Sequence, residues 1–576
     1  MSNIKPRDVQ TLLIAPDTKV VRSRTWDRLK FEVEYSLKRG TTANSYLIQA
    51  EKTALIDPPG ESFTANYIES LQMRLNWNQL DYIILGHFNA NRGVTLKALL
   101  ALAPDVKFIC SNPAAIALKS YFSEREETIN VRVIKGEETL DLGNGHQLRF
   151  ILAPTPRWPD GLLTYDPATQ ILYSDKLFGA HVCGDQVFDE GWEIYREDRQ
   201  FYFDNLYAAQ PKQVLTILDK IAAVPTIKYY ATGHGPLVQY GKTELTQLYR
   251  EWSEKQKSQD LQVVLLYASA YGNTATVAQA IARGLTKSGV AVESINCEYA
   301  QSTDIQAAIE KCDGFIMGSP TLGGHAPTQI QTALGTVLNT ASSNKLAGVF
   351  GSFGWSGEAI DYLENKLKDA GFKMGFEPIR VKFKPTDVTI QTCKEAATDF
   401  AQLLKRSQKL RTARTSVTAS GADRTAQAVG RLVGSLCVMS CRRGDATSAM
   451  LASWVSQATF NPPGLTVAVA KDRALESFTY QGDQFVLNIL EEGQQLRKYF
   501  MKRYEPGEDR FAELNTEEAS NGCLILKDGL AYLECEVQQR MECGDHWIVY
   551  AVVKNGQVLS TEGVTAVHYR KIGTHY

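Results

Sequence analysis

The chain has 576 residues, of which 44% are hydrophobic and 22% are charged. This length exceeds what one hydrophobic core supports, and it predicts about three to four domains. The formal net charge of −2 and the pI near 6.5 give no overall attraction to nucleic acid or to anionic lipid. No apolar run is long enough to span a bilayer, so we expect neither a nucleic-acid-binding protein nor a membrane protein.

The first residues and the cysteines bear on the cellular compartment. Residues 1–8 lack the basic start and apolar stretch of a secretory signal, so we expect a cytoplasmic protein in a reducing environment. The ten cysteines are then expected to be thiols. The closest pairs, Cys437 with Cys441 and Cys535 with Cys543, do not have the C-x-x-C spacing of a zinc or iron–sulfur site.

The first part of the chain mixes short strands with helices. We assign residues 1–260 to one domain on this pattern. The predicted strand 81–85 leads into Gly86 and His87, and His234 lies in the later stretch 229–236. The polar motifs of this domain therefore stand just beyond the ends of strands.

The central part of the chain repeats an apolar strand followed by a helix. Three predicted strands share this pattern, at residues 263–267, 314–318 and 347–351. Uninterrupted apolar strands joined by helices are typical of a parallel sheet that is covered on both faces. We therefore predict a doubly wound α/β domain over residues 261–406.

The last part of the chain follows a segment with little apolar periodicity. Residues 407–425 are predicted to be a linker, and the short basic stretch 405–414 is interpreted as part of it rather than as a binding patch. Residues 426–576 alternate short strands with turns, which predicts a small β-barrel.

A loop of small and hydroxyl residues follows the first strand of the central domain, and a helix is predicted from about Val277. Such a loop aims backbone N–H groups and hydroxyls at one phosphate on the positive end of the helix. The loop has neither the pattern of a nucleoside triphosphate site nor that of a dinucleotide fold. It resembles the phosphate loop of flavodoxins, which favours flavin mononucleotide (FMN). The candidate residues are Ser269, Tyr271, Gly272, Asn273 and Thr274.

Two further loops leave the same ends of later strands in the central domain. Ligands of such sheets bind beyond the carboxyl ends of the strands, so the three loops are expected to converge on one FMN site. Trp355 is predicted to stack on the flavin ring. The alternative is a domain without ligand whose loops are ordinary turns. The residues of the two loops assigned to the site are Ser319, Pro320, Thr321, Ser352, Phe353, Gly354 and Trp355.

A hydroxyl-rich segment of the last domain precedes an apolar strand and two cationic side chains. Hydroxyl groups satisfy phosphate oxygens, and the cations supply charge. The segment resembles the flavin-binding loop of split-barrel NAD(P)H:flavin oxidoreductases, which implies a second flavin, FMN or FAD, and NAD(P)H as electron donor. The assigned residues are Ser453, Ser456, Thr459, Lys471 and Arg473.

Two shorter segments of the last domain, 485–488 and 544–546, match further signatures of these reductases. The second segment contains His546, which is our candidate catalytic residue. Two interpretations of His546 stay open, a contact to flavin or nicotinamide and a hydrogen-bonded structural role.

Three segments of the first domain carry a further resemblance. Segment 86–92 stands where an H-x-E-x-D-H metal motif would begin, and segments 158–160 and 178–179 are kept motifs. Over residues 30–250 the domain is similar to the metallo-β-lactamase-like αββα domain of flavodiiron proteins. The whole chain resembles the three-domain (class C) flavodiiron proteins, the diflavin flavoproteins of oxygenic phototrophs. The resemblance implies electron transport from a nicotinamide through flavin to a diiron centre that reduces O2 to water.

The resemblance also implies which residues would bind iron, and most of them are replaced. The first and last histidines are present as His87 and His234, while the other positions have lost three carboxylates and gained three cations. Two ferric ions would add about six positive charges to these cations. The sequence therefore predicts no diiron site. The replaced positions are Asn89 for Glu, Asn91 for Asp, Arg92 and Arg157 for His, and Lys176 for the bridging Asp.

Asp175 is adjacent to the lost bridging position but is expected to point away, because neighbouring side chains of a strand lie on opposite faces. Three interpretations of the cationic pocket stay open. The cations bind a small anion such as chloride, they form a structural network, or His87 and His234 retain a single metal ion.

The leading hypothesis is an NAD(P)H:oxygen oxidoreductase subunit, in which electrons pass through flavin and reduce O2 at the diiron site of a partner. In the family that the chain resembles, head-to-tail dimers place the FMN of one subunit against the metal site of the other. This implies a homo- or hetero-oligomer with a diiron-competent paralogue. The alternatives are a stand-alone NAD(P)H:flavin (acceptor) oxidoreductase and a regulatory subunit that senses an anion. A hydrolase is disfavoured, because it also needs the lost ligands.

Overall fold

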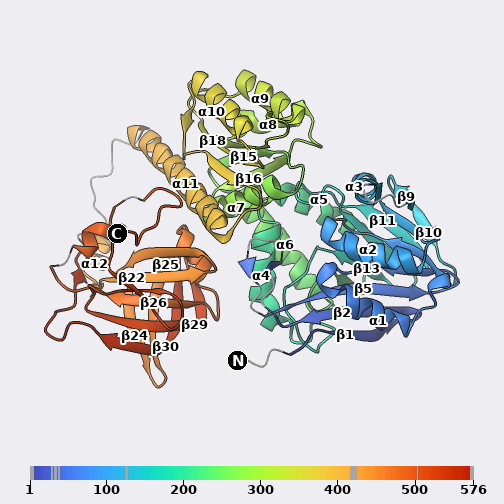
Figure 1. The fold of residues 1–576 in the computed structure, drawn as a ribbon, viewed down its shortest axis with the longest axis horizontal. Helices are drawn as coiled ribbons and strands as arrows, with labels where there is room; N and C mark the ends of the chain where they lie inside the picture. Colours follow the sequence, from blue (N-terminus) through green and yellow to red (C-terminus); the bar gives the residue numbers. More distant parts are fainter. Residues whose placement is uncertain are drawn as a thin grey trace. The chain divides into compact units, whose positions relative to one another are not determined.

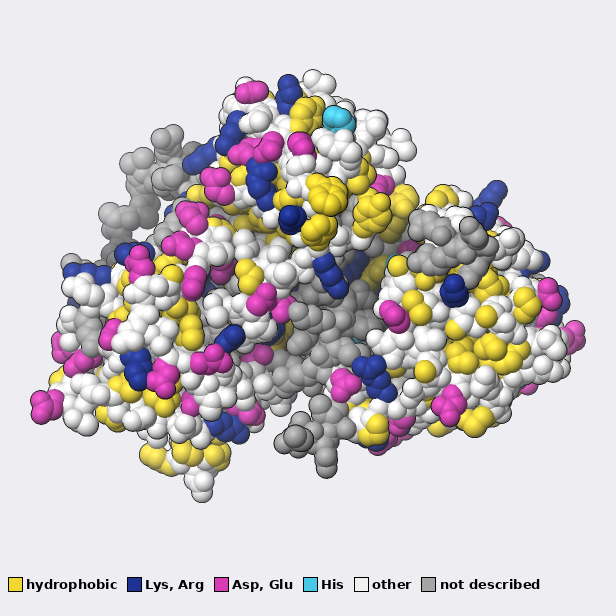
Figure 2. Space-filling view, viewed as in Figure 1, with side chains coloured by type: hydrophobic (Ala, Val, Ile, Leu, Met, Phe, Trp, Pro, Cys, Tyr) yellow, Lys and Arg dark blue, Asp and Glu magenta, His cyan; other side chains and the backbone are white. Residues whose placement is uncertain are grey.

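The computed structural model describes residues 5–27, 30–31, 35–36, 39–123, 128–415, 424–493, 495–502 and 504–570. The chain forms two compact units, Met1–Ser258 and Gln259–Tyr576, called unit 1 and unit 2 below (Figure 1). Within the described ranges, no helix is long and apolar enough to cross a membrane. Positive and negative side chains are interspersed over the face shown in Figure 2, as the small net charge predicts.

Unit 1 contains two β-sheets. The strands of the first are β1 (Asp8–Ala15), β2 (Thr18–Thr25), β5 (Thr41–Gln49), β6 (Thr53–Ile56), β7 (Leu80–Ile84), β8 (Lys107–Ser111) and β9 (Asn130–Ile134), in that order across the seven-stranded sheet. The strands of the second are β10 (Thr139–Asp141), β11 (Gln147–Leu152), β12 (Leu162–Asp166), β13 (Ile171–Asp175) and β14 (Tyr229–Thr232), in that order across the five-stranded sheet. A separate short pair is formed by β3 (Lys30–Phe31) and β4 (Tyr35–Ser36).

Helices cover the outer face of each sheet (Figure 1). Side chains of α1 (Thr64–Gln72), α2 (Ala90–Leu102) and α3 (Asn112–Ser123) pack on the seven-stranded sheet. Side chains of α4 (Arg196–Leu206), α5 (Pro211–Ala222) and α6 (Lys242–Lys257) pack on the five-stranded sheet. Short 3-10 helices lie at η1 (Glu61–Phe63), η2 (Trp77–Gln79) and η3 (Trp192–Tyr195).

The core between the two sheets explains why they stack. Val20, Tyr46 and Ile56 of the first sheet share one buried cluster with Phe150 and Tyr173 of the second. Strands with apolar side chains on both faces need cover on both sides, which the opposite sheet and the outer helices provide. The resulting αββα layers confirm the predicted metallo-β-lactamase-like fold.

The first part of unit 2 is a parallel sheet with helices on both faces. Its strands are β15 (Gln262–Tyr267), β16 (Ala291–Asn296), β17 (Gly314–Pro320), β18 (Leu346–Phe353), β19 (Lys373–Met374) and β20 (Ile379–Lys382). The order is β16-β15-β17-β18-β19, and β20 also pairs with β18. The helices are α7 (Asn273–Lys287), α8 (Ser302–Lys311), α9 (Thr328–Thr340), α10 (Glu358–Asp369) and α11 (Asp387–Thr415).

One face of this sheet is covered by α8, α9 and α10, whose Ile305, Ile330 and Ile360 join Val264 and Met317 of the strands in one core cluster. Helices α7 and α11 lie on the other face (Figure 1). This arrangement confirms the predicted doubly wound, flavodoxin-like domain.

Two boundaries in unit 2 differ from the prediction. Helix α7 begins at Asn273 rather than near Val277, because Gly272, with φ of 82°, serves as its N-cap. The predicted linker 407–425 is helical at both ends, since α11 continues to Thr415 and α12 (Arg424–Val429) begins before the linker ends. Half of the stretch 405–414 is Lys or Arg, which are good helix formers. Residues 416–423 lie outside the described part of the chain.

The last part of unit 2 is an antiparallel seven-stranded sheet. Its strands are β22 (Cys437–Arg443), β23 (Ala446–Ala452), β24 (Val455–Phe460), β25 (Pro463–Ala470), β26 (Gln484–Ile489), β29 (Ala531–Cys543) and β30 (His546–Val558), in the order β23-β22-β26-β29-β30-β25-β24. Smaller elements are β21 (Gly434–Ser435), β27 (Thr516–Glu518), β28 (Leu524–Leu526), β31 (Val567–His568), α13 (Leu496–Phe500) and η4 (Ala474–Phe478).

This sheet curls around one core. Met439, Val467, Phe485, Val537 and Val549, from five different strands, belong to the same buried cluster. The fold confirms the predicted flavin-reductase-like split barrel. No disulfide joins the ten cysteines, all of which lie in described segments.

Candidate functional site

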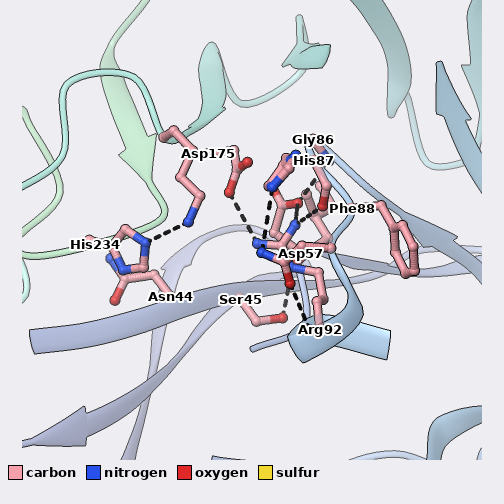
Figure 3. A network of polar contacts seen from close by, with 12 residues as sticks. Asn44, Ser45, Asp57, Gly86, His87, Phe88, Arg92, Asp175 and His234 are labelled. Atoms are coloured by element: carbon pink, nitrogen blue, oxygen red, sulfur yellow. Dashed lines mark hydrogen bonds and ion pairs between the residues drawn. The ribbon is translucent and has the colours of Figure 1, made fainter. Parts of the chain in front are cut away.

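The pocket that resembles a diiron site is organised around Arg92 (Figure 3). Its Nη1 donates to Oδ1 of Asp57 at 3.0 Å, and its Nη2 donates to Oδ1 of Asp175 at 3.2 Å. The guanidinium also donates to the backbone carbonyl of His87. All three charged side chains are nearly buried. The guanidinium therefore bridges two carboxylates inside the fold.

The local sequence places Arg92 in this position. Asn89 is the N-cap of α2, and its Oδ1 accepts a hydrogen bond from the backbone N–H of Arg92 at 2.9 Å. Arg92 is therefore fixed in the first turn of the helix. Asp57 directly follows β6, and it accepts a second hydrogen bond from the backbone N–H of Gly86 at 2.8 Å. Asn89 and Asn91 are both exposed at the surface.

Burial and charge act in opposite directions on this cluster. Burial, and then repulsion from Asp175, raise the pKa of Asp57 to about 7, although Arg92 opposes the rise. Burial also disfavours the charged form of Arg92, but Asp175 and Asp57 outweigh it and raise the pKa of Arg92 above its ordinary value. Arg92 thus stays cationic and supplies the charge that keeps two buried acids compatible with the fold.

Lys176 occupies the second former ligand position. Its Nζ lies 3.0 Å from Nε2 of His234, and Nδ1 of His234 lies 2.7 Å from the carbonyl oxygen of Thr42. The carbonyl accepts only, so the proton of a neutral His234 is on Nδ1, and Nε2 accepts from the ammonium group. The nitrogen that would face a metal therefore faces Lys176.

His87 is held by Asp160. Nδ1 of His87 donates to Oδ1 of Asp160 at 2.8 Å, and the N–H of Phe88 donates to Oδ2 at 2.8 Å. Burial disfavours ionisation of Asp160, but His87 and the N–H of Phe88 hold its pKa below the ordinary value. A cavity of about 30 Å³ lies against His87, Asp175 and Lys176. It has room for about one or two water molecules.

The expectation that Asp175 points away from the pocket is wrong. Its carboxylate reaches Arg92, because β13 ends at this residue and the alternation of a regular strand does not hold there. Asp175 has a φ of 42°, and the pairing of β13 with β14 shifts register between Tyr173 and Asp175. Asp57 was not predicted as part of the pocket. Its signal in the sequence is an acid placed directly after the buried strand β6.

Arg157 lies at the margin of this region. Its guanidinium stands 5.1 Å from the ring centroid of Trp158, and the side chain is half-buried. Its backbone N–H donates to Oε1 of Gln210 at 3.3 Å. Arg92 contacts the acids Asp57 and Asp175, and Lys176 contacts His234. These contacts support the structural-network interpretation of the pocket.

These side chains do not fit a diiron centre. A bridging site needs several carboxylate and imidazole ligands, and here the candidate ligand atoms of Asp57, Asp175 and His234 face cationic side chains instead. Among the residues that the structure describes, no group of three His, Cys, Asp or Glu is arranged to hold a metal ion.

The three loops predicted to form the FMN site come together at the carboxyl ends of β15, β17 and β18. Oγ1 of Thr274 and Oγ of Ser352 share a hydrogen bond of 2.8 Å, which joins the first loop to the third. The N–H of Thr321 donates to the carbonyl of Ser352 at 2.9 Å, which joins the second loop to the third. Oγ of Ser269 accepts from the N–H of Ala275 at 3.0 Å, at the start of α7.

This cradle fits a single phosphate. Gly272 adopts a left-handed conformation with open space around it, and Asn273 is the first residue of α7, so backbone N–H groups of the helix start are close to the loop. Oγ1 of Thr321 is buried with no hydrogen-bond partner, as expected of a hydroxyl that serves a ligand. The rings of Tyr271 and Trp355 are 86% and 91% exposed. Both rings are therefore accessible for stacking on a flavin.

The other assigned residues of these loops have backbone or support roles in the structure. Ser319 is buried, and its hydroxyl donates to the carbonyl of Pro320 at 2.8 Å. Phe353 is the last residue of β18, and Gly354 follows it directly.

A cavity of about 440 Å³ lies between helix α11 and the reductase-like barrel. Two of the five assigned residues line it, Ser453 and Arg473. Trp454 and His568 also line it and were not predicted. Trp454 lies inside the assigned segment, whereas no pattern in the sequence singles out His568. The lining includes cations such as Arg473 and Lys502, which can pair with a flavin phosphate, and also the acids Glu395 and Asp399.

The other three assigned residues do not line this cavity. Thr459 Oγ1 donates to the carbonyl of Pro462 at 2.7 Å, and Ser456 is exposed on β24. The ammonium of Lys471 contacts Glu542 and a backbone carbonyl. The predicted role of these three residues in flavin binding therefore stays a prediction.

The ring of His546 contacts the ring of Trp454. Their ring centroids are 4.8 Å apart, and Nδ1 of His546 donates to Oδ1 of Asp545 at 2.7 Å. This hydrogen bond lowers the pKa of Asp545. Arg570 lies 4.8 Å from the centroid of the Trp454 ring. The geometry is consistent with a supporting role of His546, and its predicted catalytic role stays a prediction.

The folds and loops define a flavoprotein oxidoreductase with three fold types on one chain. Family models match each part: "ODP family beta lactamase" over residues 41–235, "Flavodoxin" over 265–396 and "Flavin reductase like domain" over 429–573. The chain belongs to the diflavin flavoprotein A family, the class C flavodiiron proteins.

Relatives support this membership along the whole chain. Diflavin flavoprotein A 6 of Nostoc sp. (strain PCC 7120) is 63% identical, with 100% of both chains covered. Diflavin flavoprotein A 1 of Synechocystis sp. (strain PCC 6803) is 43% identical, over 99% of this chain and 98% of that protein. A solved structure, the metal-soaked Flv1 flavodiiron core of Synechocystis sp. PCC6803, is 62% identical with a TM-score of 0.68, and covers 70% of this chain and 100% of its own.

Proposed function

We propose that this chain is a subunit of an NAD(P)H:oxygen oxidoreductase that passes electrons from NAD(P)H through its flavin sites to the diiron centre of a partner subunit, where O2 is reduced to water. One observation carries the proposal. Both flavin-binding architectures are kept, whereas Arg92 and Lys176 face the acids and the histidine of the metal pocket.

The flavin of the barrel, FMN or FAD, would accept hydride from a nicotinamide, and the FMN of the flavodoxin-like part would pass the electrons on. The chain's own residues bind and orient both flavins. In the flavodoxin-like part, Ser269, Thr274 and Thr321 would hold the phosphate and Trp355 would cover the ring. In the barrel, Ser453 and Arg473 would bind the phosphate end.

The pocket of unit 1 takes no part in oxygen chemistry under this proposal. Arg92 bridges the carboxyl groups of Asp57 and Asp175, and Lys176 contacts His234, so these side chains have partners in the fold without metal. A diiron-competent paralogue would complete the assembly, which predicts a hetero-oligomer. A homo-oligomer of this chain alone would then lack oxygen-to-water activity.

A stand-alone NAD(P)H:flavin oxidoreductase is the second candidate. It is favoured by the match of residues 429–573 to the flavin reductases, and by a cavity large enough for a nucleotide cofactor that this part of the chain forms together with α11. Under this candidate the chain needs no partner, and reduced flavin would react with O2 directly.

Oxygen product analysis tests the proposal. The purified chain is mixed with NADH or NADPH and O2, with and without a diiron-competent relative, and flavin reduction, O2 uptake and peroxide are followed. We expect rapid flavin reduction, peroxide when the chain is alone, and water when the relative is present. A chain that alone reduces O2 to water would contradict the proposal. Unchanged peroxide yield with the relative would favour the stand-alone reductase.

The FMN cradle gives a separate prediction. Ser269→Ala is expected to raise the dissociation constant of FMN about tenfold, because a hydrogen bond to a charged phosphate is lost. Fluorescence titration of the flavin-free chain measures the change. Ser342→Ala is the control, since Ser342 is exposed and precedes β18 at the opposite end of the strand. Equal FMN affinity in the parent and in Ser269→Ala would show that Ser269 does not bind the phosphate.

A further inference from the structure

Phe383 has an unusual backbone conformation at the edge of the FMN site. It follows β20 directly and adopts a φ of 59°, in the left-handed region that disfavours large side chains. Its side chain is 56% exposed, between two exposed neighbours, Lys382 and Lys384. An exposed apolar ring and a left-handed backbone both lower the stability of the fold. Packing in the core therefore does not explain why a phenylalanine stands at this position.

Two contacts of Phe383 lead to the third FMN loop, at Phe353 and Gly354. Its N–H donates to the carbonyl of Phe353 at 2.8 Å. A Cβ atom built on Gly354 would lie 3.5 Å from Cε1 of the Phe383 ring, so the edge of the ring faces this glycine. Nζ of Lys382 stands 5.7 Å from the ring centroid, within range of a cation–π contact. The ring therefore lies against the backbone that leads into Trp355.

The place of Phe383 in the sheet brings it to the same edge as the phosphate loop. Strand β20 runs parallel to β18, with Lys382 opposite Phe353. Residues that follow parallel strands emerge at one edge of the sheet, which is also where Tyr271 and Trp355 emerge. Phe383 is thus an exposed aromatic ring at the same carboxyl edge as Tyr271 and Trp355.

We infer that Phe383 is a positioning residue of the FMN site, which supports the Gly354–Trp355 backbone so that the Trp355 ring is held for stacking on the flavin. The inference rests on the proposed FMN site. A non-glycine residue in a left-handed conformation at the edge of a ligand site stores strain that surrounding contacts must hold. The contacts of Phe383 with Phe353 and Gly354 keep its backbone in this conformation.

Phe383→Gly separates this role from a structural one. Glycine adopts the left-handed conformation without strain, so the melting temperature of the flavin-free chain is expected to stay equal or to rise by about 2–4 °C. The dissociation constant of FMN is expected to rise about tenfold, since one aromatic support is lost. Phe383→Tyr, which keeps the ring, is expected to bind FMN as the parent does.

Gln170→Gly is the matched control. Gln170 also has a left-handed conformation, with φ of 58°, but it is an exposed residue of unit 1. We expect the same effect on melting and no change in FMN affinity. Parental FMN affinity in Phe383→Gly would overturn the inference, and so would a lower melting temperature with a parallel loss of FMN, which marks a structural residue. Absence of FMN binding in the parent itself would refute the proposed site instead.

Discussion

Replacing Arg92 with alanine is expected to lower the free energy of unfolding of unit 1 by about 3–5 kcal/mol, because it leaves two buried carboxylates without their common cation. Asp57 and Asp175 both contact the Arg92 guanidinium and are almost fully buried. Urea unfolding measures the change. Arg149→Ala is the control, since Arg149 is exposed on β11, and its effect is expected to stay below about 0.5 kcal/mol.

The loss in Arg92→Ala is expected to grow with pH. The pKa of Asp57 is already raised to about 7, and removal of a cation raises it further. An acid whose pKa is higher in the folded state than in the unfolded state stabilises the fold fully at acidic pH, and this contribution is lost as pH rises through the folded value. Unfolding curves at pH 5 and pH 8 test this. An Arg92→Ala chain as stable as the parent at pH 8 would show that the network is not structural.

Restoring the family ligands is expected to produce the second large effect, a rise in bound iron from near zero to about two per chain. The change removes three cations from the pocket and adds three carboxylates. The required substitutions are Asn89→Glu, Asn91→Asp, Arg92→His, Arg157→His and Lys176→Asp.

Elemental analysis of the reconstituted variant checks this expectation. Lys176→Asp alone is the control and is expected to bind no additional iron, because Arg92 still occupies the two acids. Some loss of stability is expected in the full variant, since Asn89 is also the N-cap of α2. A folded full variant without iron would mean that ligand identity alone does not explain the altered pocket.

The fold could be predicted from the sequence because the strands carry clear periodic signals. The uninterrupted apolar strands of the central part predicted a parallel sheet, and the three loops beyond them were found to be joined by hydrogen bonds at one edge. The start of α7 was predicted about four residues late, since Gly272 and Asn273 read as loop residues. Helix α11 continues into the predicted linker as far as Thr415, since the basic end of that segment contains good helix formers.

The altered pocket could be predicted only in part. The replaced ligand positions follow from the resemblance, but the partners of Arg92 do not, because Asp57 and Asp175 are 35 and 83 residues away in the chain. The direction of the Asp175 side chain was predicted wrongly, since its left-handed backbone breaks the alternation of the strand. Phe383 also has a left-handed backbone that the sequence does not reveal. Gly or Asn is the residue usually found in that conformation.

The metal and flavin content of one purified sample of the full chain tests the central claim most directly. Elemental analysis for iron is combined with flavin absorbance on the same sample. We expect iron near zero with about one to two flavins per chain, as for an electron-donating subunit whose metal pocket is replaced by a network around Arg92. Iron near two per chain would contradict the claim and show that this chain can itself carry the oxygen-reducing centre.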